Sequence, residues 1–457
     1  MTNKKNCNIF PKIPQGFLFK GANMRRELVP QGAESLTYEI REIVVVANEL
    51  KKMGIDLIYE NIGDPVAKGE AVAPWIKDEI KKLVDTNISW GYCDTQGVLQ
   101  TREFVAQRTN DEGGIQITPN DVYFFNGLGD GVAKIFGFLK REARVIGPSP
   151  AYSTHSSAEA AHSGYEHLTY TLNPDNNWEP DVNEIYNKAK YNDSIAGILV
   201  INPGNPTGAV VSRNTLKRIC EIAEELNLFV VCDEMYSEIV YSTAERVKLS
   251  TVIGSACGLS LNGISKQIPW PGSRCGWIEV YNAKKDKEFQ KYVETILKAK
   301  RLEVCSTTLP QMAIPLILGN PLYKEHLKYR ANRFEKRAEE ASRILNGNKG
   351  FRLIKPRGAF YMALLFDDGV LNSEQTLKIE NPQIKKRIEE LVSQKHFELD
   401  KRFVYYLLGS TGIISVPMTG FYSKLKGMRL TLLEEDDEKR ITIYETIRDK
   451  IKEYLAS

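Results

Sequence analysis

Short apolar runs alternate with amphipathic helical patterns through the middle of this chain, and this alternation limits the possible folds more than any other feature. Five runs are rich in Val, Ile, Leu and Phe, and four of them are followed directly by Gly, Asn or Asp: 122–125, 144–146, 197–201, 228–232 and 259–264. Continuous apolar runs of this length are typical of parallel strands buried on both faces. Between two of them, residues 214–226 place their apolar side chains on one helical face. We therefore predict an α/β fold with a mostly parallel central sheet covered by helices.

The last third of the chain has a different pattern. Residues 325–345 form a charged amphipathic stretch, residues 350–366 give two strand-like runs around a Pro-Arg-Gly turn, and residues 443–455 have apolar side chains at helical spacing. Many lysines and glutamates gather in residues 367–401, which we expect to be a helical insertion on the surface. This part of the chain predicts a smaller α+β domain.

The length of 457 residues is too great for one small domain. Two lobes fit better than three, because α/β domains often exceed 150 residues. We expect residues 1–63 to form an N-terminal arm and part of the small domain. Residues 64–320 would form the large domain and residues 321–457 the small C-terminal domain.

Composition excludes several other classes of protein. The net charge is +3 and neither sign collects into a long block, so a nucleic acid is not the expected partner. The N-terminus has no apolar segment of signal-peptide length, and glycines and Pro417 interrupt the uncharged stretch 403–423, so we predict a cytoplasmic protein without a membrane span. The seven cysteines are scattered and never form a CxxC motif, which argues against both a disulfide framework and a metal site.

A glycine-rich turn, Asn126 to Gly131, follows the first predicted strand and precedes a helical pattern. Glycines let the backbone approach a ligand, and the free N–H groups of a helix N-terminus attract anions. An ordinary structural turn is the alternative. A dinucleotide site is less favoured, because the expected βαβ context with an acidic residue about 20 positions later is missing.

Two further sites follow predicted strands. Asn202 to Gly208 contains two prolines and two glycines, so it predicts a stiff loop that fixes the direction of the Asn205 amide. Asp233 ends another run, with Tyr236 three residues later. A carboxylate at the end of a buried strand needs a cation or several donors. The structural alternatives are a turn for Asn205 and a helix cap for Asp233.

The fourth site is Ser265-Lys266-Gln267, with Arg274 eight residues after the lysine. Most lysines are solvated surface groups, but Lys266 lies among Ile264, Ile268 and Trp270. Desolvation lowers the pKa of an amine and makes it a usable nucleophile. Together the four sites supply an anion seat, an amide, a carboxylate with a phenol, a lysine and an arginine, which is the set that pyridoxal 5′-phosphate needs.

These motifs resemble the class I/II aminotransferases, which are fold-type-I pyridoxal-phosphate enzymes. The resemblance covers nearly the whole chain and depends on the order and spacing of NPGNPTG, CDEMY, SK followed by PGSRCGW, and MRLTLL. Asp233 lies 28 positions after Asn205, and Arg274 lies eight after Lys266. The implied fold is a large domain with a mostly parallel sheet and a smaller α+β domain.

The resemblance also implies a cofactor site. Lys266 would bind the aldehyde, Asp233 would pair with the ring nitrogen, and Asn205 and Tyr236 would hydrogen-bond the phenolate oxygen. Tyr152 matches the aromatic side chain that stacks on the ring. The phosphate would be held by Gly127, Leu128, Gly129, Ser265 and Arg274 and, from a neighbouring subunit, by Tyr92. One departure is Gly263, where the family often has a serine that also binds the phosphate.

For the substrate, the resemblance implies that Arg429 binds the α-carboxylate with two hydrogen bonds. It also implies that Gly63, in the loop above the substrate, and Asn205 are substrate-binding residues. We expect a homodimeric aminotransferase that moves an amino group from an L-amino acid to a 2-oxo acid. The segments around Asn61 and Arg429 look most like the alanine-aminotransferase branch.

Two alternatives stay open at this point. A pyridoxal-phosphate β-lyase acting on cysteine-type substrates, or a decarboxylase, would use the same catalytic set, although Arg429 argues against decarboxylation. A non-catalytic ligand sensor fused to a DNA-binding module is disfavoured, because residues 1–38 are too short and too poor in basic helix for such a module.

Overall fold

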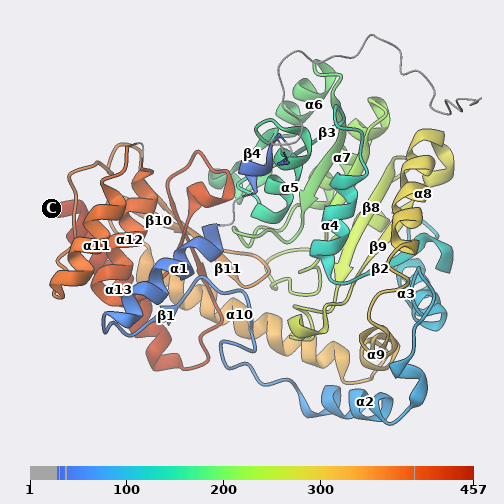
Figure 1. Cartoon of the computed structure of the whole chain (residues 1–457), viewed down its shortest axis with the longest axis horizontal. Helices are drawn as coiled ribbons and strands as arrows, with labels where there is room; N and C mark the ends of the chain where they lie inside the picture. Colours follow the sequence, from blue (N-terminus) through green and yellow to red (C-terminus); the bar gives the residue numbers. More distant parts are fainter. Residues whose placement is uncertain (1–27, 30, 37–38, 396) are drawn as a thin grey trace, which may run out of the picture.

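The structure is a computed structural model that describes residues 28–29, 31–36, 39–395 and 397–457. Residues 1–27, 30 and 37–38 of the predicted N-terminal part, with Cys7, therefore lie outside the described residues. The described elements form two units, each built around its own sheet (Figure 1). We call them the large unit, with helices α2 to α9, and the small unit, with α1 and α10 to α13.

The large unit contains an eight-stranded sheet. Its strands run in the order β2 (Val122–Phe125), β9 (Gly276–Tyr281), β8 (Cys257–Gly263), β7 (Phe229–Asp233), β6 (Ile195–Ile201), β3 (Arg144–Ser149), β4 (Thr169–Asn173) and β5 (Glu179–Pro180). Strands β8, β7, β6, β3 and β4 are parallel, whereas β9 is antiparallel to both of its neighbours and β5 is antiparallel to β4. All five strands predicted from the sequence are confirmed, and so is the mostly parallel sheet.

Helices cover both faces of this sheet because successive strand residues point to opposite sides. On β6, Ile198 and Val200 pack in one apolar cluster, while Leu199 and Ile201 pack in another. Helices α4 and α8 contribute to the second cluster, and α3, α6, α7 and α9 contribute to the first. The helices of this unit are α2 (Pro74–Val84), α3 (Leu99–Asp111), α4 (Leu128–Gly137), α5 (Ser153–Ser163), α6 (Val182–Lys190), α7 (Arg213–Glu225), α8 (Lys287–Arg301) and α9 (Thr308–Leu318).

The small unit combines the end of the chain with part of its beginning. An antiparallel sheet has the order β10 (Phe351–Ile354), β11 (Tyr361–Phe366), β14 (Gly427–Thr431) and β13 (Val416–Pro417), and β1 (Ile58–Tyr59) pairs in parallel with β12 (Ile413–Ile414). Its helices are α1 (Glu39–Lys52), α10 (Tyr323–Leu345), α11 (Pro382–Val392), α12 (Leu399–Thr411) and α13 (Asp437–Ala456). In Figure 1, α1 lies among the C-terminal helices and α10 runs between the two units. The domain limits given above stay a prediction.

The segment 367–401 differs from the expected surface insertion. Its helical part is confirmed as α11, but Leu377 and Ile379 before this helix are buried with Ile384 and Ile388 of the helix itself. Gly409 of α12 leaves room for them, because a Cβ there would lie 2.8 Å from Ile388. The lysines and glutamates that suggested a surface position occupy the outer face of a helix whose inner face belongs to the core.

The uncharged stretch 403–423 folds into the second half of α12, strands β12 and β13 and a short turn. Among the helices of the described residues, none combines the length and the apolar composition needed to cross a bilayer. The cytoplasmic location stays a prediction.

Candidate active site

Four predicted site segments meet at one edge of the large sheet. The turn at Gly127 follows β2, the Asn205 loop follows β6, Asp233 ends β7 and Lys266 follows β8. Strands β6, β7 and β8 are parallel, and the two antiparallel pairings through β9 give β2 the same direction as β8. Their carboxyl ends therefore share one edge, which is where open α/β sheets bind ligands.

The small unit closes over this edge through its Pro-Arg-Gly turn. The N–H groups of Arg357 and Gly358 donate to the carbonyl of Gly208, at 2.8 and 2.9 Å. Tyr241 and Ile239, which follow β7, exchange backbone hydrogen bonds with the same turn. The site is therefore built from both units.

The side chain of Lys266 points to Gly63, in the loop between β1 and α2. Its Nζ donates to the carbonyl oxygen of Gly63 at 2.5 Å and lies 5.9 Å from the centre of the Phe360 ring. Burial lowers the pKa of the Lys266 amine to about 8, opposed by Asp64 and assisted by Arg429 and other arginines. Because desolvation disfavours the ammonium form, this lysine is a better nucleophile and base at neutral pH than an exposed one.

Asp233 is held from two sides. Its Oδ2 lies 2.9 Å from Nε2 of His155, and its Oδ1 accepts the N–H of Met235 at 3.0 Å. The alternative of a helix cap is not confirmed, because a turn rather than a helix follows β7, and within this turn only one oxygen of Asp233 accepts a backbone N–H. Sequence reasoning missed His155, although its place one turn after Tyr152 in α5 offered a signal: the two rings pack edge to face with centroids 6.2 Å apart.

Tyr236 and Arg429 meet across Tyr361, which sequence reasoning also missed. The hydroxyl of Tyr236 donates to that of Tyr361 at 3.0 Å, and burial raises the pKa of Tyr236 well above its usual value. The guanidinium of Arg429 lies over the Tyr361 ring, with Cζ 4.5 Å from the centroid. Tyr361 begins β11, in a run that the sequence identified as a strand but not as part of the site.

Arg429 is buried among neutral oxygen atoms. Its Nη1 donates to Oδ1 of Asn205 at 3.2 Å, and its Nη2 donates to the carbonyl of Asn61. Within the described part of the chain, its Nε has no hydrogen-bond partner. The side chain is 1% exposed, so a full positive charge is desolvated here without a carboxylate among these partners.

The glycine turn after β2 lies against the guanidinium of Arg274. Gly127 has a φ of 83°, and a Cβ at this position would lie 2.4 Å from Nη2 of Arg274. Glycine is therefore required for the guanidinium to lie against the turn. Helix α4 begins at Leu128 and directs its first N–H groups here. Arg274 is exposed. Ser265, which directly precedes Lys266, is buried.

The departure at Gly263 has a packing explanation. A Cβ at this position would lie 2.7 Å from Cε of Met235 and 3.1 Å from the carbonyl oxygen of Cys275. The side chain of Met235 thus fills the space that a serine at position 263 would need.

Tyr92 is a predicted site residue that lies at the surface. It is 85% exposed, and its neighbours Trp90 and Ile88 are also exposed. Residues 91–95 lie beside 304–308, because Thr95 donates to the Val304 carbonyl and Thr308 donates to the Gly91 carbonyl.

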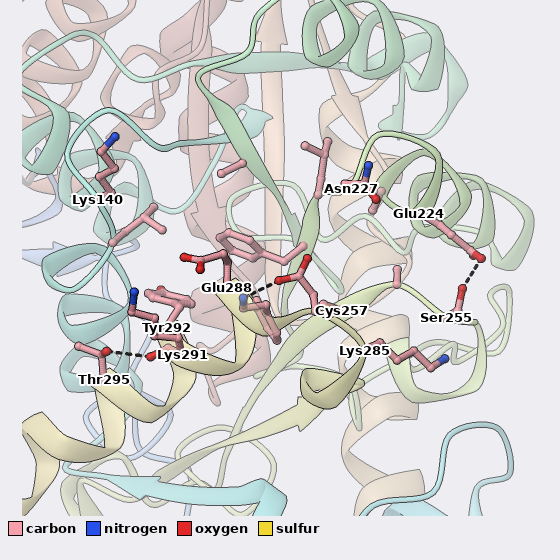
Figure 2. A pocket seen from close by; sticks show the side chains of 18 of the residues that line it. Lys140, Glu224, Asn227, Ser255, Cys257, Lys285, Glu288, Lys291, Tyr292 and Thr295 are labelled. Atoms are coloured by element: carbon pink, nitrogen blue, oxygen red, sulfur yellow. Dashed lines mark hydrogen bonds between the residues drawn. The ribbon is translucent and has the colours of Figure 1, made fainter.

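A cavity of about 620 Å³ opens at the opposite edge of the sheet (Figure 2). It is lined by the starts of β6, β7 and β8 and by α8, and Figure 2 shows Cys257, Tyr292 and Glu288 around it. The predicted site residues do not line it. The cavity therefore lies at the amino ends of the strands, away from the edge that gathers the reactive side chains.

The chain is similar to known proteins along most of its length. Residues 61–441 match the family model described as aminotransferase class I and II. An uncharacterized aminotransferase of Methanocaldococcus jannaschii is 54% identical over 434 residues, which are 95% of this chain and 100% of that protein. The glutamate-pyruvate aminotransferase of Escherichia coli is 30% identical over 332 residues, which are 72% of this chain and 80% of that enzyme.

Solved structures agree with the sequence comparisons. An alanine aminotransferase from Pyrococcus furiosus superposes with a TM-score of 0.78 at 26% identity, covering 94% of this chain and 99% of that one. An aminotransferase from Escherichia coli gives 0.79, also at 26% identity, with 93% and 97% covered. The chain belongs to the class I and II aminotransferases, and its fold is the fold-type-I arrangement of that family.

Proposed function

We propose that this aminotransferase uses pyridoxal 5′-phosphate to move an amino group from an L-amino acid to a 2-oxo acid, with alanine and 2-oxoglutarate as the preferred pair. The site residues fit each group of this cofactor. Lys266 has a lowered pKa and faces the site, the Gly127 turn beside Arg274 suits a phosphate, and Asp233 retains acceptor capacity for a ring N–H. Asn205 uses its oxygen on Arg429, so its Nδ2 is oriented to donate.

The observation that carries the proposal is the environment of Arg429. A buried guanidinium whose partners are the neutral oxygens of Asn205 and Asn61 is poorly compensated. A substrate α-carboxylate would supply the missing negative charge and accept two parallel N–H bonds. Gly63 connects this arginine to the reactive amine, because the loop that contains Asn61 also supplies the carbonyl that Lys266 contacts.

Each residue then has a defined task. When bound, the cofactor would supply an electron sink for the negative charge that develops on the substrate α-carbon. Arg429 would bind and orient the carboxylate, and the Lys266 amine would remove the α-proton as a base and return a proton as an acid. Asp233 keeps the ring nitrogen protonated, with His155 fixing the orientation of its carboxylate. Tyr361 and the small unit exclude water from the site.

Two observations support a small amino donor. The Tyr361 hydroxyl reaches so close to the loop that a Cβ on Gly63 would lie 1.8 Å from it, which leaves little room above the site. Relatives of this chain carry the names glutamate-pyruvate aminotransferase and alanine aminotransferase. We assign the same substrate class to this chain.

We also propose a homodimer with shared active sites. Ile88, Trp90 and Tyr92 are each more than two thirds exposed, and the adjoining Leu302 and Val304 are exposed as well. Apolar side chains gathered in this way mark an interaction surface. In a dimer, Tyr92 would reach the phosphate seat of the partner.

The visible absorption spectrum of the purified protein tests the proposed reaction. We expect a band after incubation with pyridoxal 5′-phosphate, its loss on addition of alanine, and its return with 2-oxoglutarate. Aspartate and an aromatic amino acid serve as comparison donors. Lys266→Ala is the matched control and should give no such band.

Two outcomes would contradict the proposal. Absence of the band in the wild-type chain would remove the cofactor assignment. Formation of pyruvate and ammonia from a cysteine derivative without any 2-oxo acid would identify a lyase.

A further inference from the structure

Arg330 of α10 forms hydrogen bonds with all three of its guanidinium nitrogens next to the reactive lysine. Nε and Nη2 bind the two carboxylate oxygens of Glu70, at 2.6 and 3.0 Å. Nη1 donates to the carbonyl of Lys266 and, at 3.1 Å, to that of Gln267. Arg330 is 1% exposed and Glu70 is 6% exposed, so this ion pair is shielded from solvent.

Glu70 closes a compact turn that begins at Gly63. The N–H of Glu70 donates to the carbonyl of Pro65 at 2.9 Å, and Asp64 accepts the N–H groups of Val66 and Ala67. Fixing Glu70 therefore fixes the position of Gly63, whose carbonyl accepts the Lys266 amine at 2.5 Å. One guanidinium thus holds both the backbone of the lysine and the segment that its amine contacts.

We propose that Arg330 and Glu70 form a positioning pair that sets the location of the Lys266 amine in the active site. The pair is not part of the motifs that identify the family, and it does not touch the reacting atoms. Its role depends on the proposed function only in that Lys266 must be the reactive amine.

Helix α10 also joins this pair to the substrate arginine. Arg330, Arg333 and Arg337 recur at i, i+3 and i+7 and so share one helical face. Arg333 lies 2.8 Å from Glu70 and 3.2 Å from Glu435, and Arg337 donates to the carbonyl of Leu432 at 2.9 Å. Leu432 directly follows β14, the strand that carries Arg429. The same row of arginines therefore fixes the backbone beside Lys266 and beside Arg429.

The test compares Arg330→Lys, Arg330→Gln and Glu70→Gln with the control Arg144→Lys. Arg144 of β3 forms another buried bidentate pair, with Glu159 of α5, so its replacement reports the general cost of disrupting such a pair. Lysine keeps the charge of Arg330 but cannot reproduce its planar fork. Glu70→Gln provides a second, nearly isosteric change if the Arg330 variants fold poorly.

The first readout is steady-state kinetics. We expect kcat to fall by about tenfold or more in all three test variants, with the KM of the amino donor changed less than about threefold, because a small displacement of a reacting group costs rate more than binding. Arg144→Lys should lower thermal stability but keep kcat within about twofold of wild type. Unchanged kcat in folded Arg330 and Glu70 variants would overturn the proposal.

The second readout does not need the cofactor. In the cofactor-free full chain, the acylation of Lys266 by an amine reagent is followed against pH by mass spectrometry. Burial is the main cause of the lowered pKa of Lys266, and the cation of Arg330 adds to it, so Arg330→Gln should raise the midpoint, whereas Arg330→Lys should shift it less. An unmoved midpoint in Arg330→Gln would contradict the proposal. Retained activity in Lys266→Ala would instead refute the proposed function and leave the acylation result standing.

Discussion

Asp233 shows how single side chains prepare this site. Both of its oxygens already have a partner, His155 on one side and the Met235 N–H on the other. A carboxylate has about four lone-pair positions, so these contacts orient it without using up its capacity to accept a further N–H. The carboxylate is therefore fixed in direction before any ligand arrives, which reduces the cost of binding.

The pKa of Lys266 predicts how fast the cofactor-free protein binds pyridoxal 5′-phosphate at each pH. Burial lowers this pKa to about 8, so about a tenth of the amine is already in the reactive neutral form at pH 7. We expect the rate of appearance of the visible band to rise between about pH 7 and pH 8 and to level off above about pH 9. An ordinary lysine would keep gaining rate up to about pH 10, and such a profile would refute the assignment.

Arg429 gives a second prediction for a single residue. Replacement by lysine keeps the charge but loses the two parallel N–H bonds to a carboxylate. We expect the KM of the amino donor to rise by about 10- to 100-fold, since a hydrogen bond to a charged group is worth about 1.5–3 kcal/mol. Cofactor binding should stay close to wild type. Steady-state kinetics and the visible band measure the two effects, and an unchanged KM would contradict the carboxylate assignment.

Among the elements, α3 and the loop after β7 are joined by an ion network. Arg108 of α3 lies 2.8 Å from Glu238, and Arg246 lies 2.9 Å from Glu238 and 2.7 Å from Glu112 at the end of α3. Burial raises the pKa of Glu238, but Arg246, Lys248 and Arg108 outweigh this effect and lower it to about 2. Glu238 follows Tyr236 by two residues, so the network anchors the segment that carries a site residue.

This network predicts a loss of stability in acid. The pKa of Glu238 is about 2 in the folded protein and ordinarily 4.5, so its stabilising contribution is present above about pH 4.5 and is lost as the pH falls towards 2. Glu238→Gln should lower the free energy of unfolding at pH 7 by about 3 kcal/mol, and the difference from wild type should shrink towards pH 3. Thermal denaturation across this range measures both. Glu225→Gln, in an exposed pair with Arg218, should cost less than about 1 kcal/mol, and equal losses in the two variants would contradict the role of burial.

For the whole molecule, the question is whether one chain makes a complete site. Lys266, Asp233 and Arg429 are gathered by a single chain, whereas Tyr92 is directed to solvent. A two-fold symmetric dimer through the exposed surface at Trp90 and Tyr92 would bring each Tyr92 to the partner's site.

Subunit mixing tests this arrangement. Tyr92→Ala and Lys266→Ala should each be nearly inactive, but a mixed dimer contains one site with both residues intact. An equal mixture should therefore recover about a quarter of the wild-type activity after subunit exchange. Tyr191→Ala, another exposed tyrosine, should retain full activity. A mixture that stays as inactive as its parents, or a monomer with full activity in sedimentation experiments, would exclude shared sites.

The fold and part of the site could be predicted from sequence because both depend on local patterns. Apolar runs identify the strands, and the residues directly after a run, such as Asp233 and Lys266, must lie at the edge of the sheet. Tyr361 and the pair of Arg330 with Glu70 could not be found in this way, because their roles depend on contacts between segments far apart in the chain. The space beside Gly263 is a similar case, since Met235 fills it from the neighbouring strand end.

The pairing of β1 with β12 has a consequence for how the protein is made. Ile58 pairs with Ile413, which follows it by 355 positions, and the buried face of α1 belongs to an apolar cluster made mostly of residues from 334 onwards. At typical rates of synthesis, this strand waits roughly 20 to 70 seconds for its partner to leave the ribosome. The large unit has its strands in one continuous stretch and can fold during that time. The apolar face of α1 meanwhile lacks most of the residues that cover it in the folded protein, so it stays exposed on the nascent chain.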